Sequence, residues 1–317
     1  MLIDQDFSSD RTKYIGGSDV AGLLGISPFK SPIDVWMEKT GKKTSEANTL
    51  PLRFGSFAET FVANEYAKAT GFGLHHDESI FIHPRYAFAG AHVDRFVYAN
   101  GLDQPANRLL ECKTAHPFTS HQWGEAGTDQ IPMHYLTQVI WYQIVTGIPQ
   151  ADLAVLFGNN DFRIYAINHD PELEELVLQK AIFFWTEYVQ KDIPPPAQSS
   201  ADCQTLFRRS HPSKTIEADL KTCKAYERLQ ILVNHQERHE TEIELLKTQI
   251  MAHMQDAEVL THQGNTLATW KSPKAGFRLD AKRLEHEEPG IFEKYKVPLQ
   301  ASRRFVLKTK NHLEVSA

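Results

Sequence analysis

Cysteine is scarce in this sequence, and no two cysteines form a CxxC pair. Its 317 residues include only Cys112, Cys203 and Cys223, an odd number at wide spacings. A disulfide framework needs paired cysteines, and cysteine-held zinc or iron–sulfur sites need closely spaced ligands. The sequence therefore argues against both kinds of site, and it indicates a reducing compartment.

Long apolar runs are absent as well. None approaches the roughly 20 residues that a membrane-spanning helix needs. The first residues, MLIDQDFSSDR, contain acids and lack the apolar segment of a secretory signal. We therefore expect neither a signal peptide nor a membrane-bound protein.

The chain also lacks the positive net charge that is typical of many nucleic-acid-binding proteins. It carries 34 lysines and arginines against 40 acids, a formal net charge of −6. Residues 271–310 hold eleven of the basic residues and five of the acids, so this part carries +6 and the remainder −12. A nuclease with a carboxylate-rich centre and a local basic surface fits this distribution, and so does an acidic enzyme with a basic tail.

The first 190 residues combine helical periodicity with strand-like segments. Segments 16–25, 31–41 and 55–71 have helical spacing with glycines at or near their ends, and Ser18 and Ser31 are candidate N-caps. In the third of these helices, an amphipathic pattern predicts an apolar face made by the side chains of Phe57, Phe61, Val62 and Tyr66.

Strand-like segments follow these helices along the chain. Strands are expected at 78–84, 88–100, 107–114, 151–158 and 161–170, and further helices at about 131–146 and 171–191. This order predicts an α/β (α+β) fold, in which a mixed central β-sheet is flanked by helices.

A proline-rich segment divides the chain. IPPPAQSS, residues 193–200, is the clearest linker, which predicts a core at 1–192 and a C-terminal helical and β extension at 201–317. In the extension, residues 215–257 have the composition of one long helix or of a helical hairpin. NTLATWK and RRFVLKTK (303–310) are expected to be strand-like.

One acidic and basic constellation stands at the end of a predicted strand. In LLECKT, alternation along the strand puts Glu111 and Lys113 on one face and the inert thiol of Cys112 on the other. Asp94 lies 17 residues before Glu111, in the neighbouring predicted strand. Asp94, Glu111 and the carbonyl of Cys112 can ligate Mg²⁺, while Lys113 positions water and offsets charge on a phosphate. A surface Glu–Lys pair beside an unrelated aspartate is the alternative.

Four motifs in order resemble a known family. They are YIGGSDVAGLLGISPFKSPIDVWMEKTG, FGSFAETFVANEYAKATG, the D…ExK pattern of Asp94, Glu111 and Lys113, and the QxxxY helix of Gln138 and Tyr142. Together they resemble the YqaJ-like viral recombinase family, which includes phage lambda exonuclease and related alkaline exonucleases. The resemblance covers roughly residues 11–190 and implies the PD-(D/E)xK restriction-endonuclease-like core.

The resemblance implies roles for individual residues. Asp94 and Glu111 correspond to the metal-binding carboxylates, Lys113 to the catalytic lysine, Glu59 to a supporting acid, and Gln138 to a glutamine near the lysine and water.

The resemblance also implies a site for the 5′ phosphate. It assigns Arg11 and Ser18 to the 5′-terminal phosphate and places His92 and Tyr142 with the residues that bind phosphate and DNA. An arginine with a hydroxyl and amides at a helix N-terminus is suitable chemistry for a phosphate. His92 and Val93 depart from the family pattern, and no second basic contact follows Lys113.

By the same resemblance, the expected activity is 5′-to-3′ exonuclease digestion of one strand of double-stranded DNA. The expected cofactor is Mg²⁺, with two ions bound and Mn²⁺ able to substitute. The expected substrate is double-stranded DNA with a 5′-phosphorylated end, and the expected assembly is a homotrimer. The expected partner protein is a single-strand annealing protein. The expected location is the cytoplasm of a bacterium that carries the phage or prophage. Alternatives are a single-strand-specific or endonucleolytic DNase on the same core, a non-enzymatic DNA-binding accessory, or an unrelated α/β enzyme.

Overall fold

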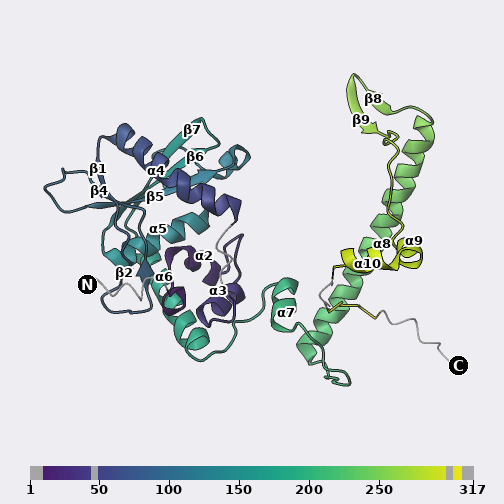
Figure 1. Ribbon diagram of the computed structural model, residues 1–317, viewed down its shortest axis with the longest axis horizontal. Helices are drawn as coiled ribbons and strands as arrows, with labels where there is room; N and C mark the ends of the chain where they lie inside the picture. Colours follow the sequence, from purple (N-terminus) through teal and green to yellow (C-terminus); the bar gives the residue numbers. More distant parts are fainter. Residues whose placement is uncertain (1–9, 44–48, 298–302, 309–317) are drawn as a thin grey trace. The chain divides into compact units, whose positions relative to one another are not determined.

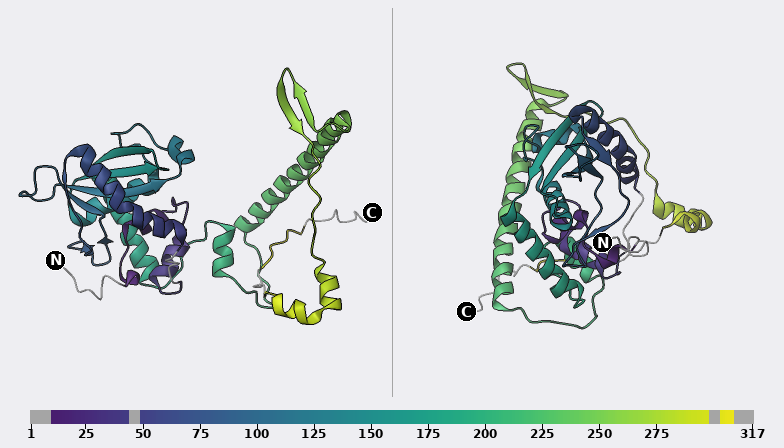
Figure 2. Two further views of the ribbon diagram at one scale, coloured as in Figure 1. Left: turned by 45° about the horizontal axis from the view of Figure 1, so that its top comes forward. Right: turned by 90° about the vertical axis from the view of Figure 1, so that its left-hand side faces the viewer.

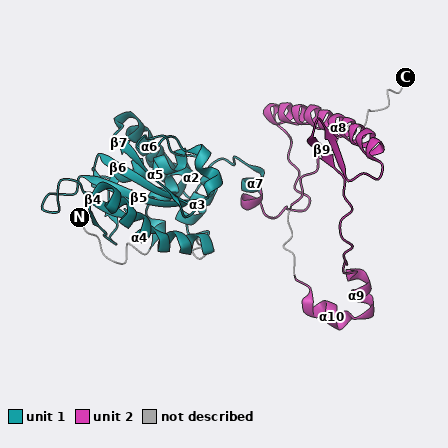
Figure 3. Cartoon of the chain, turned by 90° about the horizontal axis from the view of Figure 1, so that it is seen from above, with its two compact units in different colours: residues 1–203 teal, residues 204–317 magenta. Residues whose placement is uncertain are grey.

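The computed structural model describes residues 10–43, 49–297 and 303–308. The chain divides into two compact units, residues 1–203 and residues 204–317 (Figure 3). The first unit contains every residue that the sequence assigns to the nuclease site.

A five-stranded mixed sheet forms the centre of the first unit (Figure 1). Its strand order is β1-β4-β5-β6-β7, and only the β5–β6 pair is parallel. The strands are β1 (Gly73–His75), β4 (Arg95–Tyr98), β5 (Arg108–Ala115), β6 (Gln150–Phe157) and β7 (Asp161–Asn168). The predicted mixed sheet is confirmed, and β1 is a strand that the sequence did not predict.

A separate two-stranded ribbon lies in the same unit. It consists of β2 (Phe81–Ile82) and β3 (Gly90–Ala91), which pair antiparallel. The long segment predicted as one strand over 88–100 is therefore two short strands, β3 and β4. Asp94 stands directly before β4, at the end of the sheet.

Helices cover both faces of the sheet, as predicted. On one face, α4 (Leu50–Thr70) packs Val62 and Tyr66 against a cluster that includes Leu110 and Cys112 of β5. On the other face lies α5 (Met133–Thr146), whose Gln138 contacts Glu111. Successive side chains of β5 thus alternate between α4 and α5, and the Cys112 thiol points into the α4 side of the core.

The predicted apolar face of α4 is partly wrong. Val62 and Tyr66 are buried, but Phe57 and Phe61 are 81% and 54% exposed. The buried stripe instead begins at Ala58, one residue after Phe57, and continues through Val62 and Tyr66 at intervals of four residues. The helix is thus rotated relative to the expectation, with two phenylalanines facing away from the sheet.

In the described residues before α4, the short helices are η1 (Arg11–Lys13), α2 (Gly17–Leu23) and α3 (Pro32–Lys39). Ser31 is the N-cap of α3, as predicted, and its hydroxyl accepts a hydrogen bond from the Asp34 amide at 3.2 Å. Ser18 is not a cap.

Gly16 is the N-cap residue of α2, and Ser18 lies inside the helix. The Asp19 carboxylate accepts a hydrogen bond from the Gly16 amide at 3.0 Å. This bond satisfies the backbone amide of the N-cap residue, so the Ser18 hydroxyl is not needed as a cap and can contact another partner.

The remaining elements of the first unit are η2 (Pro117–Gln122) between β5 and α5, and α6 (Pro171–Phe184), η3 (Trp185–Val189) and α7 (Ser200–Leu206) after β7. η3 is a turn of π-helix, and the last residues of α7 belong to the second unit. The helix predicted at about 171–191 is thus α6 continued by a π-helical turn. Residues 193–199 have no helix or strand before α7 begins.

A single long helix dominates the second unit (Figure 2). Its elements are α8 (Leu220–Met254), the antiparallel hairpin of β8 (Val259–His262) and β9 (Asn265–Thr269), α9 (Ala281–Glu287) and α10 (Pro289–Tyr295). The region 215–257 therefore contains one helix and not a helical hairpin. Residues 303–308 form no strand, contrary to the prediction for RRFVLKTK, and 309–310 lie outside the described residues.

No helix in the described part of the chain is both long enough and apolar enough to cross a membrane.

Candidate active site

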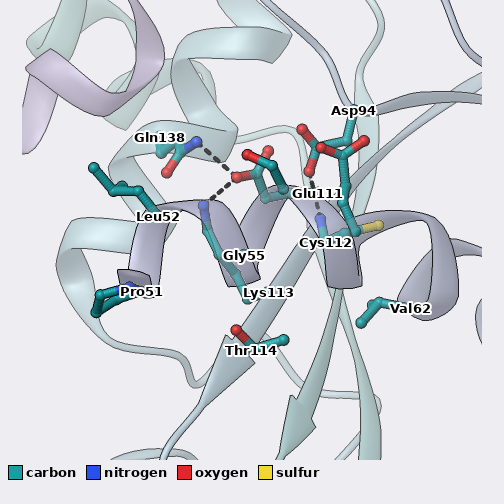
Figure 4. A pocket seen from close by; sticks show the side chains of 12 residues that line it. Pro51, Leu52, Gly55, Val62, Asp94, Glu111, Cys112, Lys113, Thr114 and Gln138 are labelled. Carbon is teal, nitrogen blue, oxygen red and sulfur yellow. Dashed lines mark hydrogen bonds and ion pairs between the residues drawn. The ribbon is translucent and has the colours of Figure 1, made fainter. Parts of the chain in front are cut away.

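A cavity of about 350 Å³ opens beside α4, at the start of β4 and along β5 from Glu111 to Thr114 (Figure 4). Its lining includes Glu59, Asp94, Glu111, Lys113 and Gln138, which come from four separate segments of the chain. The structure therefore brings together all five residues that the sequence assigned to catalysis.

The register of β4 and β5 places Asp94 across from Glu111. Arg95 pairs with Leu110 in this antiparallel ladder, so the preceding and following residues face each other. The Cys112 amide donates a hydrogen bond of 2.7 Å to Asp94 Oδ2. Because N–H and C=O groups of one strand residue point to the same edge, the Cys112 carbonyl also faces this side.

Burial and like charge act together on Asp94. Burial is the largest cause that raises its pKa well above the usual range, and the neighbouring carboxylate of Glu111 adds to it, whereas Lys113 acts in the opposite direction. Two carboxylates that lie close together in a poorly solvated site repel each other, and a bound cation reduces this repulsion.

Glu111 is held from two sides. Its Oε1 accepts a hydrogen bond of 2.7 Å from Gln138 Nε2 and forms an ion pair with Lys113. Its other oxygen, Oε2, is buried and has no hydrogen-bond partner among the described residues. A buried carboxylate oxygen without a partner is costly, which makes it a suitable ligand for a cation.

Lys113 remains a cation in this setting. Burial by itself would lower its pKa, but the negative charges of Glu111 and Asp94 outweigh burial and raise it. Its ammonium group also lies 5.4 Å from the centre of the Tyr135 ring, at cation–π distance. The site thus holds one positive charge next to two carboxylates.

Gln138 and Tyr142 lie one turn apart on α5, as their spacing predicted. Gln138 Nε2 donates a hydrogen bond of 2.7 Å to the Tyr142 hydroxyl, so the same amide group contacts Tyr142 and Glu111. Tyr142 is buried, and burial followed by the charge of Glu111 raises its pKa well above the usual range. Its geometry is that of a residue that positions Gln138. Its assignment to DNA binding stays a prediction.

Glu59 and Arg95 form an ion pair beside the cavity. Arg95 Nη1 lies 2.5 Å from Glu59 Oε1 and 2.9 Å from His76 Nδ1, and it also donates to the Asp94 carbonyl. The sequence reasoning missed Arg95. A signal was present, because an arginine directly after Asp94 in a buried strand must face the opposite side and needs an anion there.

Arg11 and Ser18 meet at a second site in the same unit. Arg11 Nη2 donates a hydrogen bond of 3.0 Å to the Ser18 hydroxyl. The Arg11 carbonyl accepts from the buried Lys39 ammonium at 2.8 Å, and Lys39 in turn pairs with Asp19 at 2.6 Å. Partial burial, and then the nearby Arg11 charge, lower the pKa of His92. Arg11 and Ser18 are therefore in direct contact, and the charge of Arg11 acts on His92.

Gly17 connects the two sites. A side-chain Cβ at this position would lie 2.5 Å from the Tyr142 ring and 3.1 Å from Gln138 Cγ. Glycine therefore lets the first turn of α2, which carries Ser18, pack directly on the face of α5 that supports Glu111.

The donor set fits Mg²⁺. No group of three or more His, Cys, Asp or Glu residues in the described ranges has the arrangement of a complete metal cage. Mg²⁺ does not need one, because it commonly binds one or two carboxylates and keeps waters and substrate phosphates as its other ligands. The unpartnered Glu111 Oε2 and the repulsion between Asp94 and Glu111 are features that a divalent cation satisfies.

The fold and the site thus define a protein with paired carboxylates and a lysine at the end of a mixed sheet. Residues 6–149 match the YqaJ-like viral recombinase domain. The chain is also 33% identical over 306 residues to the uncharacterized protein YqaJ of Bacillus subtilis (strain 168), covering 94% of this chain and 92% of that protein. The chain belongs to the YqaJ-like viral recombinase family, which confirms the resemblance predicted from its motifs.

Two solved exonuclease structures are similar to this chain at low identity. The alkaline exonuclease LHK-Exo of Laribacter hongkongensis is 16% identical with a TM-score of 0.48, covering 60% of this chain and 94% of that one. A phage related exonuclease of Haemophilus somnus 129PT is 12% identical with a TM-score of 0.43, covering 56% of this chain and 95% of that one.

Proposed function

We propose that this protein is a Mg²⁺-dependent exonuclease that digests one strand of double-stranded DNA from its 5′ end and leaves a 3′ overhang. Membership in the YqaJ-like viral recombinase family supports a phage-type exonuclease role. The observation that carries the proposal is the convergence of Asp94, Glu111 and Lys113 in one cavity.

Asp94 and Glu111 would hold the metal, with the Cys112 carbonyl as a third protein ligand, and Mn²⁺ would substitute for Mg²⁺. When bound, the metal would lower the pKa of a water molecule and offset negative charge on the scissile phosphate. Lys113 would stabilise the charge that develops on the phosphate oxygens. Gln138 would keep the Glu111 carboxylate in a fixed orientation through its 2.7 Å hydrogen bond.

Two ions are proposed, and Glu59 is the acid that would support the second. It lines the same cavity as Asp94 and Glu111. Its present partner is Arg95, so the guanidinium group and a second cation would compete for the same carboxylate.

The 5′ terminal phosphate would bind at Arg11 and Ser18, with His92 at its edge. The 3.0 Å hydrogen bond between Arg11 and Ser18 supports this proposal, because both groups can donate to one phosphate. A pocket for the terminal phosphate would select 5′ ends and would set the direction of digestion.

The proposed assembly and partners follow the family. We propose a homotrimer that encloses the duplex, because a closed ring gives processive digestion. The overhang would be the substrate of a single-strand annealing protein, in the cytoplasm of a bacterium that carries the phage or prophage.

A strand-specific digestion assay tests this function. A linear duplex carries a label and a 5′ phosphate on one strand only, and it is incubated with the protein in Mg²⁺ or in EDTA. We expect Mg²⁺-dependent loss of the phosphorylated strand from its 5′ end while the complementary strand survives. Internal nicks, or cleavage of single strands only, would contradict the exonuclease proposal in favour of a different DNase on this core.

Two variants separate the chemistry from binding. Lys113→Ala should reduce hydrolysis by about a hundredfold or more while duplex binding persists. Lys68→Ala, which removes an exposed lysine of α4, is the matched control and should leave hydrolysis unchanged.

Arg11→Ala should abolish the preference for phosphorylated 5′ ends, and an unchanged preference would rule out the proposed phosphate pocket.

A further inference from the structure

Lys39, the last residue of α3, is a buried lysine that contacts the backbone of the proposed phosphate site. Its side chain is 1% exposed, and its Nζ lies 2.8 Å from the Arg11 carbonyl oxygen and 2.6 Å from Asp19 Oδ2. A buried ammonium group is costly unless it is paired and hydrogen-bonded, and these two acceptors supply both. Lys39 thus joins η1, which carries Arg11, to α2, which carries Asp19 and Ser18.

The two side chains assigned to the phosphate are open to solvent, in contrast to this buried pair. Arg11 and Ser18 are both exposed, and Arg11 Nη2 donates a hydrogen bond of 3.0 Å to the Ser18 hydroxyl. None of the three residues of η1 is buried, so side-chain packing does little to hold this short helix. The hydrogen bond from Lys39 to the Arg11 carbonyl therefore gives η1 a fixed connection to the core.

Asp19 is a second anion that the Arg11 guanidinium could approach. Burial would raise the pKa of this carboxyl group, but Lys39, Lys30 and Arg11 outweigh burial and lower it to about 2, so it is ionised at neutral pH. A Cβ on Gly16 would lie 3.4 Å from Arg11 Nη2 and 3.6 Å from Asp19 Oδ2. Both charged groups therefore lie next to the same glycine, with no side chain of that residue between them.

The two lysines occupy the Asp19 carboxylate and so direct Arg11 elsewhere. Lys39 lies 2.6 Å from Oδ2, and Lys30 lies 3.3 Å from Oδ1. A carboxylate that already has a cation on each oxygen gains little from a third one. The Arg11 guanidinium therefore contacts the Ser18 hydroxyl. Without Lys39, the carboxylate would lack a cation at Oδ2 and would attract Arg11 away from Ser18.

We propose that Lys39 is a positioning residue for recognition of the 5′ phosphate. It fixes the Arg11 backbone and neutralises Asp19, so that the guanidinium group stays beside Ser18. The terminal phosphate is itself an anion, so neutralisation of Asp19 also reduces repulsion of this ligand. The inference rests on the proposed phosphate pocket and adds to it a buried residue that acts through Arg11.

The digestion of two matched duplexes by the full chain tests this role. The duplexes differ only in a 5′ phosphate or a 5′ hydroxyl, and kcat and KM are measured for each in Mg²⁺. Lys39→Met should reduce the preference for the phosphorylated duplex by about tenfold or more, the range for a hydrogen bond to a charged group. The loss should come mainly from a higher KM, while digestion of the hydroxyl duplex stays near wild type. A folded Lys39→Met protein with the wild-type preference would overturn the proposal.

Lys43→Met is the matched control. Lys43 follows the same helix, is 41% exposed and pairs with Asp34 at 2.9 Å. Its removal should keep the wild-type preference. Equal losses of preference in Lys43→Met and Lys39→Met would overturn the proposal, because the loss would then reflect the total charge of the protein.

A double variant separates positioning from general disruption of the fold. Lys39→Met leaves Asp19 buried without its cation at 2.6 Å, which lowers stability. Lys39→Met/Asp19→Asn removes both charges, so it should recover stability in urea denaturation and should no longer attract Arg11. Its phosphate preference should lie between those of Lys39→Met and the wild type, because the Arg11 carbonyl still lacks its donor.

A double variant with the preference of the wild type, or with that of a folded Lys39→Met protein, would overturn the proposal. Where Lys39→Met does not fold, the double variant decides by itself. A preference below that of the wild type supports the role of Lys39, and an equal preference overturns it.

Arg11→Ala, measured on the same duplexes, distinguishes this inference from the pocket on which it rests. If Arg11→Ala loses the preference and Lys39→Met keeps it, the pocket stands and the role of Lys39 is wrong. If Arg11→Ala keeps the preference, the pocket and the role of Lys39 are both wrong. Absence of digestion by the wild-type protein would overturn the proposed nuclease function, and this inference with it.

Discussion

Arg95 Nη1 lies 2.5 Å from Glu59 Oε1, and this ion pair connects α4 to the strand that follows Asp94. Arg95 is 8% exposed and also donates to the Asp94 carbonyl. One guanidinium group therefore fixes two acidic residues of the proposed active site relative to each other.

Arg95→Met should destabilise the fold and misplace Asp94. Glu59 would be left without its cation, and because this carboxylate is 27% exposed, we expect a loss of about 2 kcal/mol in the free energy of unfolding. Urea denaturation measures it. In the double variant Arg95→Met/Glu59→Gln, part of this stability should return, and a double variant as unstable as the single one would show that the pair is not the cause.

Asp19 should contribute stability that depends on pH. Burial would raise its pKa, but Lys39, Lys30 and Arg11 outweigh burial and lower it to about 2. Burial dominates at Lys39 and lowers its pKa, because this lysine faces one carboxylate, whereas Asp19 faces three cations. We therefore attribute the pH-dependent stability of this cluster to the ionised carboxylate of Asp19.

A depressed carboxyl pKa stabilises the fold above the pKa of the unfolded chain, near 3.8, and this stability is lost as the pH falls towards 2. Asp19→Asn should lower the free energy of unfolding at pH 7 by about 3 kcal/mol, because it leaves Lys39 buried without an anion. Urea midpoints at pH 7 and at pH 3 measure the effect. The difference in urea midpoint between the wild type and the variant should be smaller at pH 3 than at pH 7. An equal difference at both pH values would refute the assignment to Asp19.

Gly17→Ala should disturb the contact between α2 and α5. The added methyl group would lie 2.5 Å from the buried Tyr142 ring, which must move and carry Gln138 with it. We expect a loss of about 2 kcal/mol in stability. Gly55→Ala in α4 is the control, because a Cβ there meets nothing within 4 Å and alanine favours the helix. In thermal unfolding, the melting temperature should fall for Gly17→Ala and should stay unchanged or rise for Gly55→Ala.

Mg²⁺ should stabilise the wild-type protein without any DNA present. A ligand that binds only the folded state raises stability by mass action, by about 2.7 kcal/mol at one hundred times its Kd. The melting temperature should rise with Mg²⁺ concentration and return to its initial value in EDTA. Asp94→Asn should remove most of this rise, and a variant that still responds like the wild type would exclude Asp94 as a ligand.

Much of the proposed centre was predictable from local sequence. Alternation along a strand places Glu111 and Lys113 on one face, and a neighbouring strand that starts at Asp94 needs only antiparallel pairing to meet them. The start of α3 was equally local, because Ser31 and Pro32 carry the capping chemistry themselves. The four-turn helix after Pro132 followed from periodicity, and so did the shared face of Gln138 and Tyr142.

The orientation of α4 and the partners of its acid depended on long-range packing. Whether Phe57 or Ala58 faces the sheet is decided by which stripe fits against Leu110 and Cys112, and hydrophobicity alone favoured the phenylalanine. The contact between Glu59 and Arg95 spans 36 residues, so no local pattern specifies it.

The sequence by itself thus determined which side chains are candidates for the proposed chemistry and which strand presents them, because the two-residue period of a strand and the capping of a helix are local properties. Only the tertiary structure decided how these groups are held. Lys39 and Asp19 are a pair of buried opposite charges, and the buried Arg95 pairs with the half-buried Glu59. A buried charge requires whichever partner the packed chain brings within reach.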